Sequence, residues 1–207
     1  MRKFSASDLV KKSASQILYL ILKKIRLKPT PGQYNGEAYA EEIIKKEMAS
    51  SEKRGIINLD NNCLIFFCVD LVKGNKYVEI KMVNDMKDYP EWYLHSSIMQ
   101  ATLYASLLQD VTFLDTPKFR KKEGYKQEVI PVAENPIFEL WFGDHRYSIF
   151  PSNEVKQHYL NKAKLIDSCV DSTDYSKCRE FDAKFKFKEF DTFKPLFKKI
   201  KKKLEVL

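Results

Sequence analysis

In the middle of this chain a continuous apolar run is followed by a stretch in which apolar and polar residues alternate, and together they predict a β-hairpin. Residues 64–71 are apolar almost throughout, and residues 77–83 are rich in strand-forming residues. Gly74 and Asn75 lie between the two stretches and tolerate the positive φ of a tight turn. Side chains alternate between the faces of a strand, so one face of the second arm carries Tyr77, Glu79, Lys81 and Val83.

A helical period follows the hairpin. Residues 92–108 come after Pro90 and present a broad apolar surface, within which Gln100 and Tyr104 lie one turn apart on one face. Further along, apolar stretches predict strands at 111–114, 128–132, 137–142 and 147–150, and then a helix that Ser152 caps and that runs to about residue 168.

Both ends of the chain also carry patterns. Residues 17–25 predict an N-terminal helix that packs on the sheet, residues 29–32 a linker, and the Ala- and Glu-rich residues after Gly36 a second helix. Residues 184–188 alternate Lys and Phe as a strand does, while residues 198–203 form a basic, helix-like run. The apolar spacing over 190–200 predicts an amphipathic helix that packs on the domain or on a partner protein.

Composition narrows the class of protein. The chain has 207 residues and a net charge of +8, which suits one α/β domain with an anionic partner such as nucleic acid. Four cysteines without a secretory signal indicate reduced thiols and a cytoplasmic location, with Cys63 and Cys68 as core residues. Residues 17–25 are too few to span a bilayer, so we expect no membrane association.

The hairpin carries the sharpest chemistry. Antiparallel pairing across the turn can bring the carboxylate of Asp70 beside that of Glu79, with Lys81 on the same face. Two neighbouring carboxylates repel each other, and Mg²⁺ or Mn²⁺, which prefer oxygen ligands, would remove that repulsion. A lysine beside such a metal can orient the attacking water or stabilise charge on a phosphate. The alternative is an edge hairpin with ordinary solvated charges.

Asp70, the Glu79-Ile80-Lys81 tripeptide and the Gln100-x-x-x-Tyr104 pair on a helix resemble the PD-(D/E)xK nuclease superfamily, in particular its RecB-like and phage exonuclease-like branches. The resemblance implies an α/β fold with a restriction-endonuclease-like core, a mixed central β-sheet flanked by helices, and a basic C-terminal extension. We expect one domain over 1–207, with its core at about 1–115 and a strand-rich and helical elaboration at about 116–207.

The resemblance also implies roles for the residues. Asp70, Glu79 and the carbonyl group of Ile80 would hold one or two Mg²⁺ ions, and Lys81 would position the attacking water. Gln100 would brace Lys81 or a phosphate oxygen, while Tyr104 would buttress the helix or contact the DNA backbone. Hydrolysis would leave a 5′-phosphate and a 3′-hydroxyl group.

A third metal ligand is less clearly marked. The family usually carries a His or Glu four positions after the helical glycine, where this chain has Ala40. Glu41 is the nearest substitute, and Glu37, one turn earlier, is the alternative; either could instead belong to a solvated acidic face. Some RecB-like nucleases bind an iron–sulfur cluster through four cysteines, but here only Cys169 and Cys178 come late in the chain, so we predict no cluster.

Residues 116–126 predict a nucleic-acid contact, because basic residues there alternate with Phe119 and Tyr125; the basic residues are Lys118, Arg120, Lys121, Lys122 and Lys126. The partner would be a duplex end or single strand of DNA, and the alternative is a solvated hairpin.

Together these features predict a Mg²⁺-dependent deoxyribonuclease, an exonuclease or repair and recombination nuclease of the kind that phages encode, acting in the host cytoplasm in that case. The alternatives are a non-catalytic nucleic-acid-binding member of the fold and a virion or replisome interaction protein.

Overall fold

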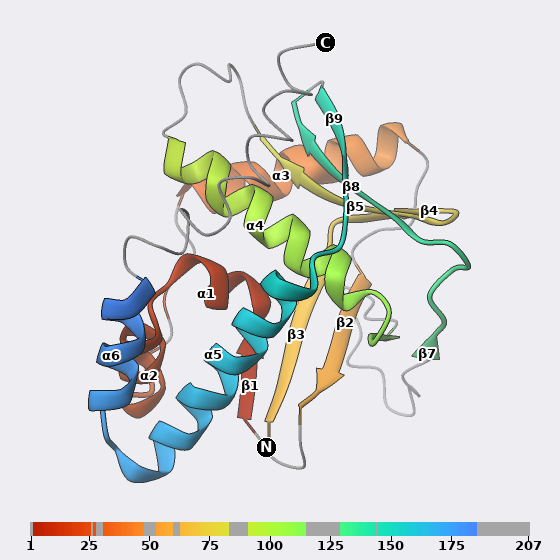
Figure 1. Cartoon of the computed structure of the whole chain (residues 1–207). Helices are drawn as coiled ribbons and strands as arrows, with labels where there is room; N and C mark the ends of the chain where they lie inside the picture. The colour runs from red at the N-terminus through yellow and green to blue at the C-terminus, as the bar shows by residue number, and fades with distance from the viewer. Residues whose placement is uncertain are drawn as a thin grey trace, which may run out of the picture.

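The computed structural model describes residues 2–25, 27, 31–47, 53–59, 63–82, 91–114, 129–143 and 145–185. In chain order (Figure 1) the elements are β1 (Arg2–Ser5), α1 (Ala6–Lys11), α2 (Ala14–Leu22), α3 (Pro31–Lys46), β2 (Lys53–Asn58), β3 (Cys63–Val69), β4 (Leu71–Lys73), β5 (Lys76–Lys81), α4 (Glu91–Leu107), β6 (Thr112–Leu114), β7 (Val129–Ile130), β8 (Ile137–Phe142), β9 (His145–Ile149), α5 (Asn153–Ser172) and α6 (Ser176–Phe185). The predicted basic residues Lys118 to Lys126, and residues 198–203 in the tail, lie outside the described residues.

The fold is mixed α/β, and its strands form two mixed sheets flanked by helices. The first sheet has the order β1-β3-β2-β6-β7 and the second the order β4-β5-β8-β9. β1 runs parallel to β3, and β5 runs parallel to β8, whereas the other neighbours are antiparallel. One central sheet was predicted; instead, the chain leaves the first sheet at the end of β3 and enters the second at β4.

The predicted hairpin is therefore correct only in part. Its turn lies at Gly74, which has a φ of +60°, and β4 and β5 pair across it with Leu71 opposite Val78. The long apolar arm, however, is broken at Asp70, and the part before the break pairs with β1 and β2. Those partners come from distant parts of the chain, so the run of apolar residues alone could not reveal the break.

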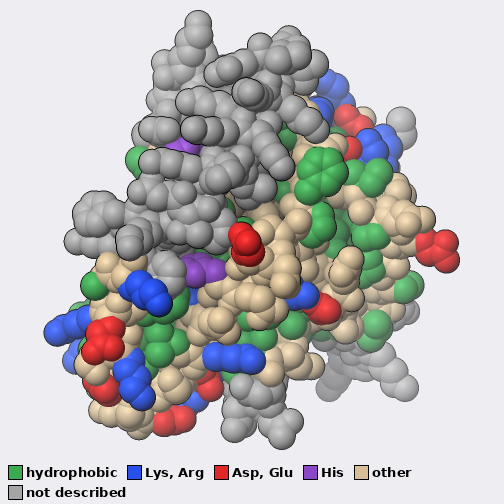
Figure 2. All heavy atoms as spheres, in the orientation of Figure 1, with side chains coloured by type: hydrophobic (Ala, Val, Ile, Leu, Met, Phe, Trp, Pro, Cys, Tyr) green, Lys and Arg blue, Asp and Glu red, His purple; other side chains and the backbone are tan. Residues whose placement is uncertain are grey.

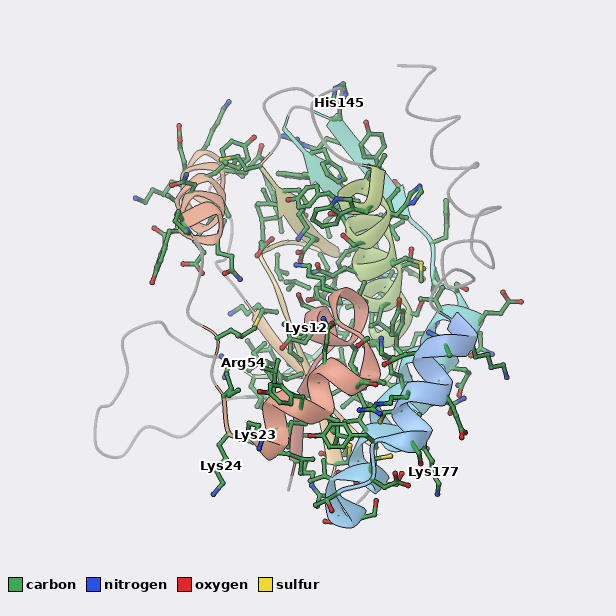
Figure 3. All side chains as sticks on the ribbon, turned by 90° about the vertical axis from the view of Figure 1, so that its left-hand side faces the viewer. Lys12, Lys23, Lys24, Arg54, His145 and Lys177 are labelled. Carbon is green, nitrogen blue, oxygen red and sulfur yellow. The ribbon has the colours of Figure 1, made fainter. Side chains whose placement is uncertain are left out.

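The second sheet is covered on both faces, as Figures 1 and 3 show, with α3 on one side and α4 on the other. Val78 and Ile80 of β5 face α3, where they pack in one apolar cluster with Tyr39 and Ile43. Tyr77, on the opposite face, belongs to the main core. This core takes residues from Phe4 to Cys178 and so joins the two ends of the described chain. β5 is an interior strand, which places Glu79 and Lys81 between β5 and α4 rather than on an open edge.

Several predicted elements are confirmed. α4, β6, β8 and β9 lie where the patterns placed them, and the Ser152 hydroxyl group caps α5 by accepting a hydrogen bond from the Val155 amide. α5 is one turn longer than predicted and ends at Ser172. Of the predicted strand near 128–132, the structure describes β7 at Val129–Ile130. Within the described residues, every helix is too short or too polar to cross a membrane.

Three local predictions are wrong. Residues 31 and 32 are not linker, because α3 begins at Pro31, a residue whose fixed φ suits the first helical position. Residues 184 and 185 end α6 rather than forming a strand; Cys178 and Phe181 recur at helical spacing and pack in the core. Finally, α2 packs on α5 and α6 instead of on a sheet.

Candidate functional site

Asp70 stands at the point where the chain passes from the first sheet to the second. Its amide donates a hydrogen bond to the Val78 carbonyl group (3.0 Å), and its carboxylate Oδ2 accepts one from the Ile80 amide (2.7 Å). The pairing of β4 with β5 ends at Leu71, which lies opposite Val78, so Asp70 stands one residue beyond the paired part of β4. The carboxylate thus accepts the hydrogen bond that the backbone carbonyl group of a further β4 residue would accept. This contact fixes the bend between β3 and β4.

Glu79, Lys81, Gln100 and Tyr104 form one connected network. The Lys81 ammonium donates to Glu79 Oε1 and lies 3.4 Å from Gln100 Oε1. Gln100 Nε2 donates to Glu79 Oε1 at 2.7 Å and to the Tyr104 hydroxyl oxygen at 3.0 Å. The amide group of Gln100 therefore holds both partners of the ion pair, and the structure brings these four side chains together.

Burial gives this network its strength. Glu79, Gln100 and Tyr104 are each less than 5% exposed. Burial by itself would lower the pKa of Lys81, but the carboxylates of Glu79 and Asp70 outweigh it, so the pKa is raised and the ammonium keeps its charge. Burial, with the nearby charge of Glu79, raises the pKa of Tyr104 well above its ordinary value, so its hydroxyl group stays protonated.

The network opens into a pocket of about 480 Å³. Its walls come from four parts of the chain: Asp70 and β5 supply the acidic floor, α3 one side, and Lys11 of α1 and Tyr93 of α4 the other. Glu37 and Ala40 of α3 line the pocket. Glu41, the first choice for a third ligand, is an exposed residue of α3 and is not among the lining residues.

The donor set suits a hard divalent cation. N–H and C=O groups of one strand residue point to the same side, and the Ile80 N–H points to Asp70, so the Ile80 carbonyl group faces the edge where Asp70 lies. The Lys81 carbonyl group instead accepts from the Gly143 amide beyond the end of β8. Asp70, Glu79 and the Ile80 carbonyl group are thus the oxygen donors, which fits Mg²⁺ because this ion binds few protein ligands and retains water or phosphate.

No group of three or more His, Cys, Asp or Glu side chains gathers in a metal-binding arrangement among the described residues. The oxygen donors nearest one another are therefore Asp70, Glu79 and the Ile80 carbonyl group, and Glu37 lines the same pocket. Cys169 and Cys178 lie together between α5 and α6, where burial and the Cys169 thiol raise the pKa of Cys178 to about 12. The four cysteines all belong to the described residues, and none of them forms a disulfide.

Sequence reasoning missed Lys11. It lines the pocket from α1, where partial desolvation of its ammonium and the charge of Lys81 lower its pKa to about 8 despite the attraction of Glu79. A motif search could not find it, because Lys11 reaches the site only through the parallel pairing of β1 with β3, which sets α1 beside the end of β3.

Comparison with known proteins adds little to this geometry. Among solved structures, the chain is similar to the one titled "Crystal structure of SSO0001", with 18% sequence identity, coverage of 81% of this chain and 76% of that chain, and a TM-score of 0.49. No protein-family model and no curated protein matches the sequence. The functional assignment therefore rests on the arrangement of residues in the pocket.

Proposed function

We propose that this protein is a Mg²⁺-dependent deoxyribonuclease with a restriction-endonuclease-like core. The observation that carries the proposal is the meeting of Asp70, Glu79 and Lys81 in one pocket, with Gln100 bonded to Glu79 and within reach of Lys81. This combination offers oxygen donors for a metal and a fixed cation for phosphate charge, which are the two requirements of metal-assisted phosphodiester hydrolysis.

Each residue has a definable part in the proposed reaction. Asp70, Glu79 and the Ile80 carbonyl group would hold Mg²⁺, which when bound polarises the scissile phosphate and lowers the pKa of a coordinated water. Lys81 remains an ammonium and donates to the attacking water or to a phosphate oxygen, because its raised pKa disfavours loss of the proton. Gln100 orients Glu79 and Lys81, and Tyr104 accepts the other N–H of Gln100, which makes both positioning residues.

Cleavage of end-labelled linear DNA and of covalently closed circular DNA tests the proposal. With Mg²⁺ the purified protein should cut linear DNA, and with EDTA it should cut neither substrate. Cutting of linear DNA alone indicates an exonuclease, whereas cutting of circles indicates an endonuclease. Asp70→Asn and Lys81→Ala should each lower the rate by on the order of 10³-fold, since each removes a group that stabilises the transition state.

Lys73→Ala is the matched control, because Lys73 lies in the same hairpin but is exposed and outside the pocket. It should cleave like the wild-type protein. Cleavage that survives Asp70→Asn in folded, purified protein would contradict the proposal.

A non-catalytic nucleic-acid-binding protein is the second candidate, and a specific observation favours it. Ala40 lines the pocket at the position where the resemblance leads us to expect an acidic residue or a histidine. This candidate predicts DNA binding that does not change between Mg²⁺ and EDTA, together with no cleavage under any metal.

A further inference from the structure

A groove adjoins the proposed active site. It has a volume of about 540 Å³ and is bounded by α1, α2 and α6. Lys11 lines both this groove and the site pocket, so the two meet at its side chain. Figure 3 looks onto the side of the molecule where these three helices lie and labels Lys12 near the junction of α1 and α2.

The side chains of this groove combine positive charge with aromatic rings. Its polar and aromatic lining includes Lys11, Lys12, Gln16, Tyr19, Tyr175 and Arg179, and no acidic residue lines it among the described part of the chain. Lys12 forms an ion pair with Asp8, and the Arg179 guanidinium lies 6.0 Å from the centre of the Tyr175 ring. Tyr19 is 48% exposed, so part of its ring is accessible for stacking.

The walls of the groove are fixed by contacts that involve neither the Lys11 ammonium nor the Arg179 guanidinium. The Asp182 carboxylate joins α6 to the start of α2 by accepting from the Ala14 amide (2.7 Å) and the Ser15 amide (3.0 Å). The Lys162 ammonium, 2% exposed, donates to the carbonyl groups of Leu9 and Lys12 (2.7 and 2.8 Å) and so holds the end of α1. Binding would therefore need little rearrangement of these helices.

We propose that this groove binds the single-stranded part of a nucleic acid whose phosphate enters the Asp70–Glu79–Lys81 pocket. Lys11 contacts the phosphate nearest the pocket, Arg179 and Lys12 contact phosphates further along, and Tyr19 stacks on a base. Single-stranded rather than duplex nucleic acid fits, because an aromatic ring can stack only on a base that has left its neighbours. The path rests on the proposed function for its direction, since the site marks one end.

Binding can be measured without cleavage. Fluorescence anisotropy of a labelled oligo(dT) in EDTA gives the dissociation constant at several salt concentrations. Lys11→Ala and Arg179→Ala should each weaken binding by on the order of tenfold and should lower the slope of log K against log salt by about 0.7, the value for one phosphate contact on a single strand. Tyr19→Ala should weaken binding to a similar degree, and Tyr19→Phe should restore it because the ring remains.

Lys177→Ala is the control, since Lys177 lies on α6 two residues before Arg179, is exposed, and does not line the groove (Figure 3). It should bind like the wild-type protein. The proposal is overturned if Lys11→Ala and Arg179→Ala bind oligo(dT) as tightly as the wild-type protein does. It is also overturned if the groove variants lose as much affinity for a blunt duplex as they lose for oligo(dT). Failure of the nuclease proposal is distinguishable, because it appears as cleavage by Asp70→Asn and leaves these binding measurements unaffected.

Discussion

Glu79 and Lys81 are a buried ion pair, and burial makes each depend on the other. Their side chains are 5% and 12% exposed, so neither charge has much water to replace its partner. Removing one member of such a pair leaves an uncompensated charge, while replacing both by neutral groups of similar size is often tolerated. The stability of the protein therefore depends on keeping both members of this pair, which is not so for a surface pair.

A double-mutant cycle tests this coupling. Lys81→Met should lower the free energy of unfolding by about 3 kcal/mol, because the Glu79 carboxylate is left buried and unpaired. The combined Glu79→Gln, Lys81→Met variant should recover most of that loss, as measured by urea unfolding in EDTA. Lys73→Met, which breaks the exposed Lys73–Glu47 pair, should change little. Losses that simply add in the double variant would show that the two groups do not interact.

Helices α1, α2 and α6 depend on polar anchors that come from distant parts of the sequence. Ser13 and Gln16 form a capping box at the start of α2, and Asp182 of α6 occupies the neighbouring amides of the same helix end. A carboxylate at a helix N-terminus satisfies amides that have no partner within the helix and interacts favourably with the helix dipole. Asp182 therefore links the stability of α2 to the position of α6, which carries Arg179.

Asp182→Ala should lower the free energy of unfolding by about 1–3 kcal/mol, since two amides and the Ser15 hydroxyl group lose their acceptor. It should also weaken oligo(dT) binding, because α6 would no longer hold Arg179 beside α1. Asp171→Ala is the comparison: it removes a carboxylate that is 74% exposed and paired with Arg2, and it should have a smaller effect on both measurements. Equal effects of the two substitutions would argue against a specific anchor.

Some helices and strands form because of their local sequence, whereas the bounds or positions of others depend on contacts with distant residues. α4, β8 and the Ser152 cap follow from periodicity and a single side-chain contact, and the sequence predicts them. The end of the β3 strand at Asp70 depends on pairing with β1 and β2, and the position of α3 depends on the apolar contacts of Tyr39 and Ile43 with β5. Such contacts join residues far apart in the chain, so no short window of sequence contains them.

The residues of the candidate site also fall into two groups, those that local sequence identifies and those that only the fold brings to the pocket. Asp70, Glu79, Lys81, Gln100 and Tyr104 could be named from one hairpin and one helix, because spacing within an element fixes which side chains share a face. Lys11 and Glu37 reach the pocket on α1 and α3, whose placement is a property of the whole fold. Only three-dimensional structure separates Glu37 from Glu41.

Much of the positive charge of the whole chain lies in the sequence that follows the described helices. Residues 186–207 carry eight lysines and three acidic residues in a chain whose net charge is +8. On the face in Figure 2, basic and acidic side chains are mixed over the part that holds α5 and α6. The overall charge thus favours contact with any anion. The residues proposed to recognise a particular phosphate are those that line the pocket and the adjoining groove.

Metal binding should be visible in the stability of the whole molecule, because a ligand that binds only the folded state raises its melting temperature. At a Mg²⁺ concentration of 100 times the dissociation constant the gain is about 2.7 kcal/mol, a shift of roughly 5–11 °C in the melting temperature for a chain of this size. Differential scanning fluorimetry with Mg²⁺ against EDTA should show this shift for the wild-type protein and not for Asp70→Asn. Glu37→Gln should reduce it and Glu41→Gln should not, since Glu37 lines the pocket and Glu41 does not. The reverse order would return Glu41 as the third ligand, and an equal shift in Asp70→Asn would place the metal elsewhere.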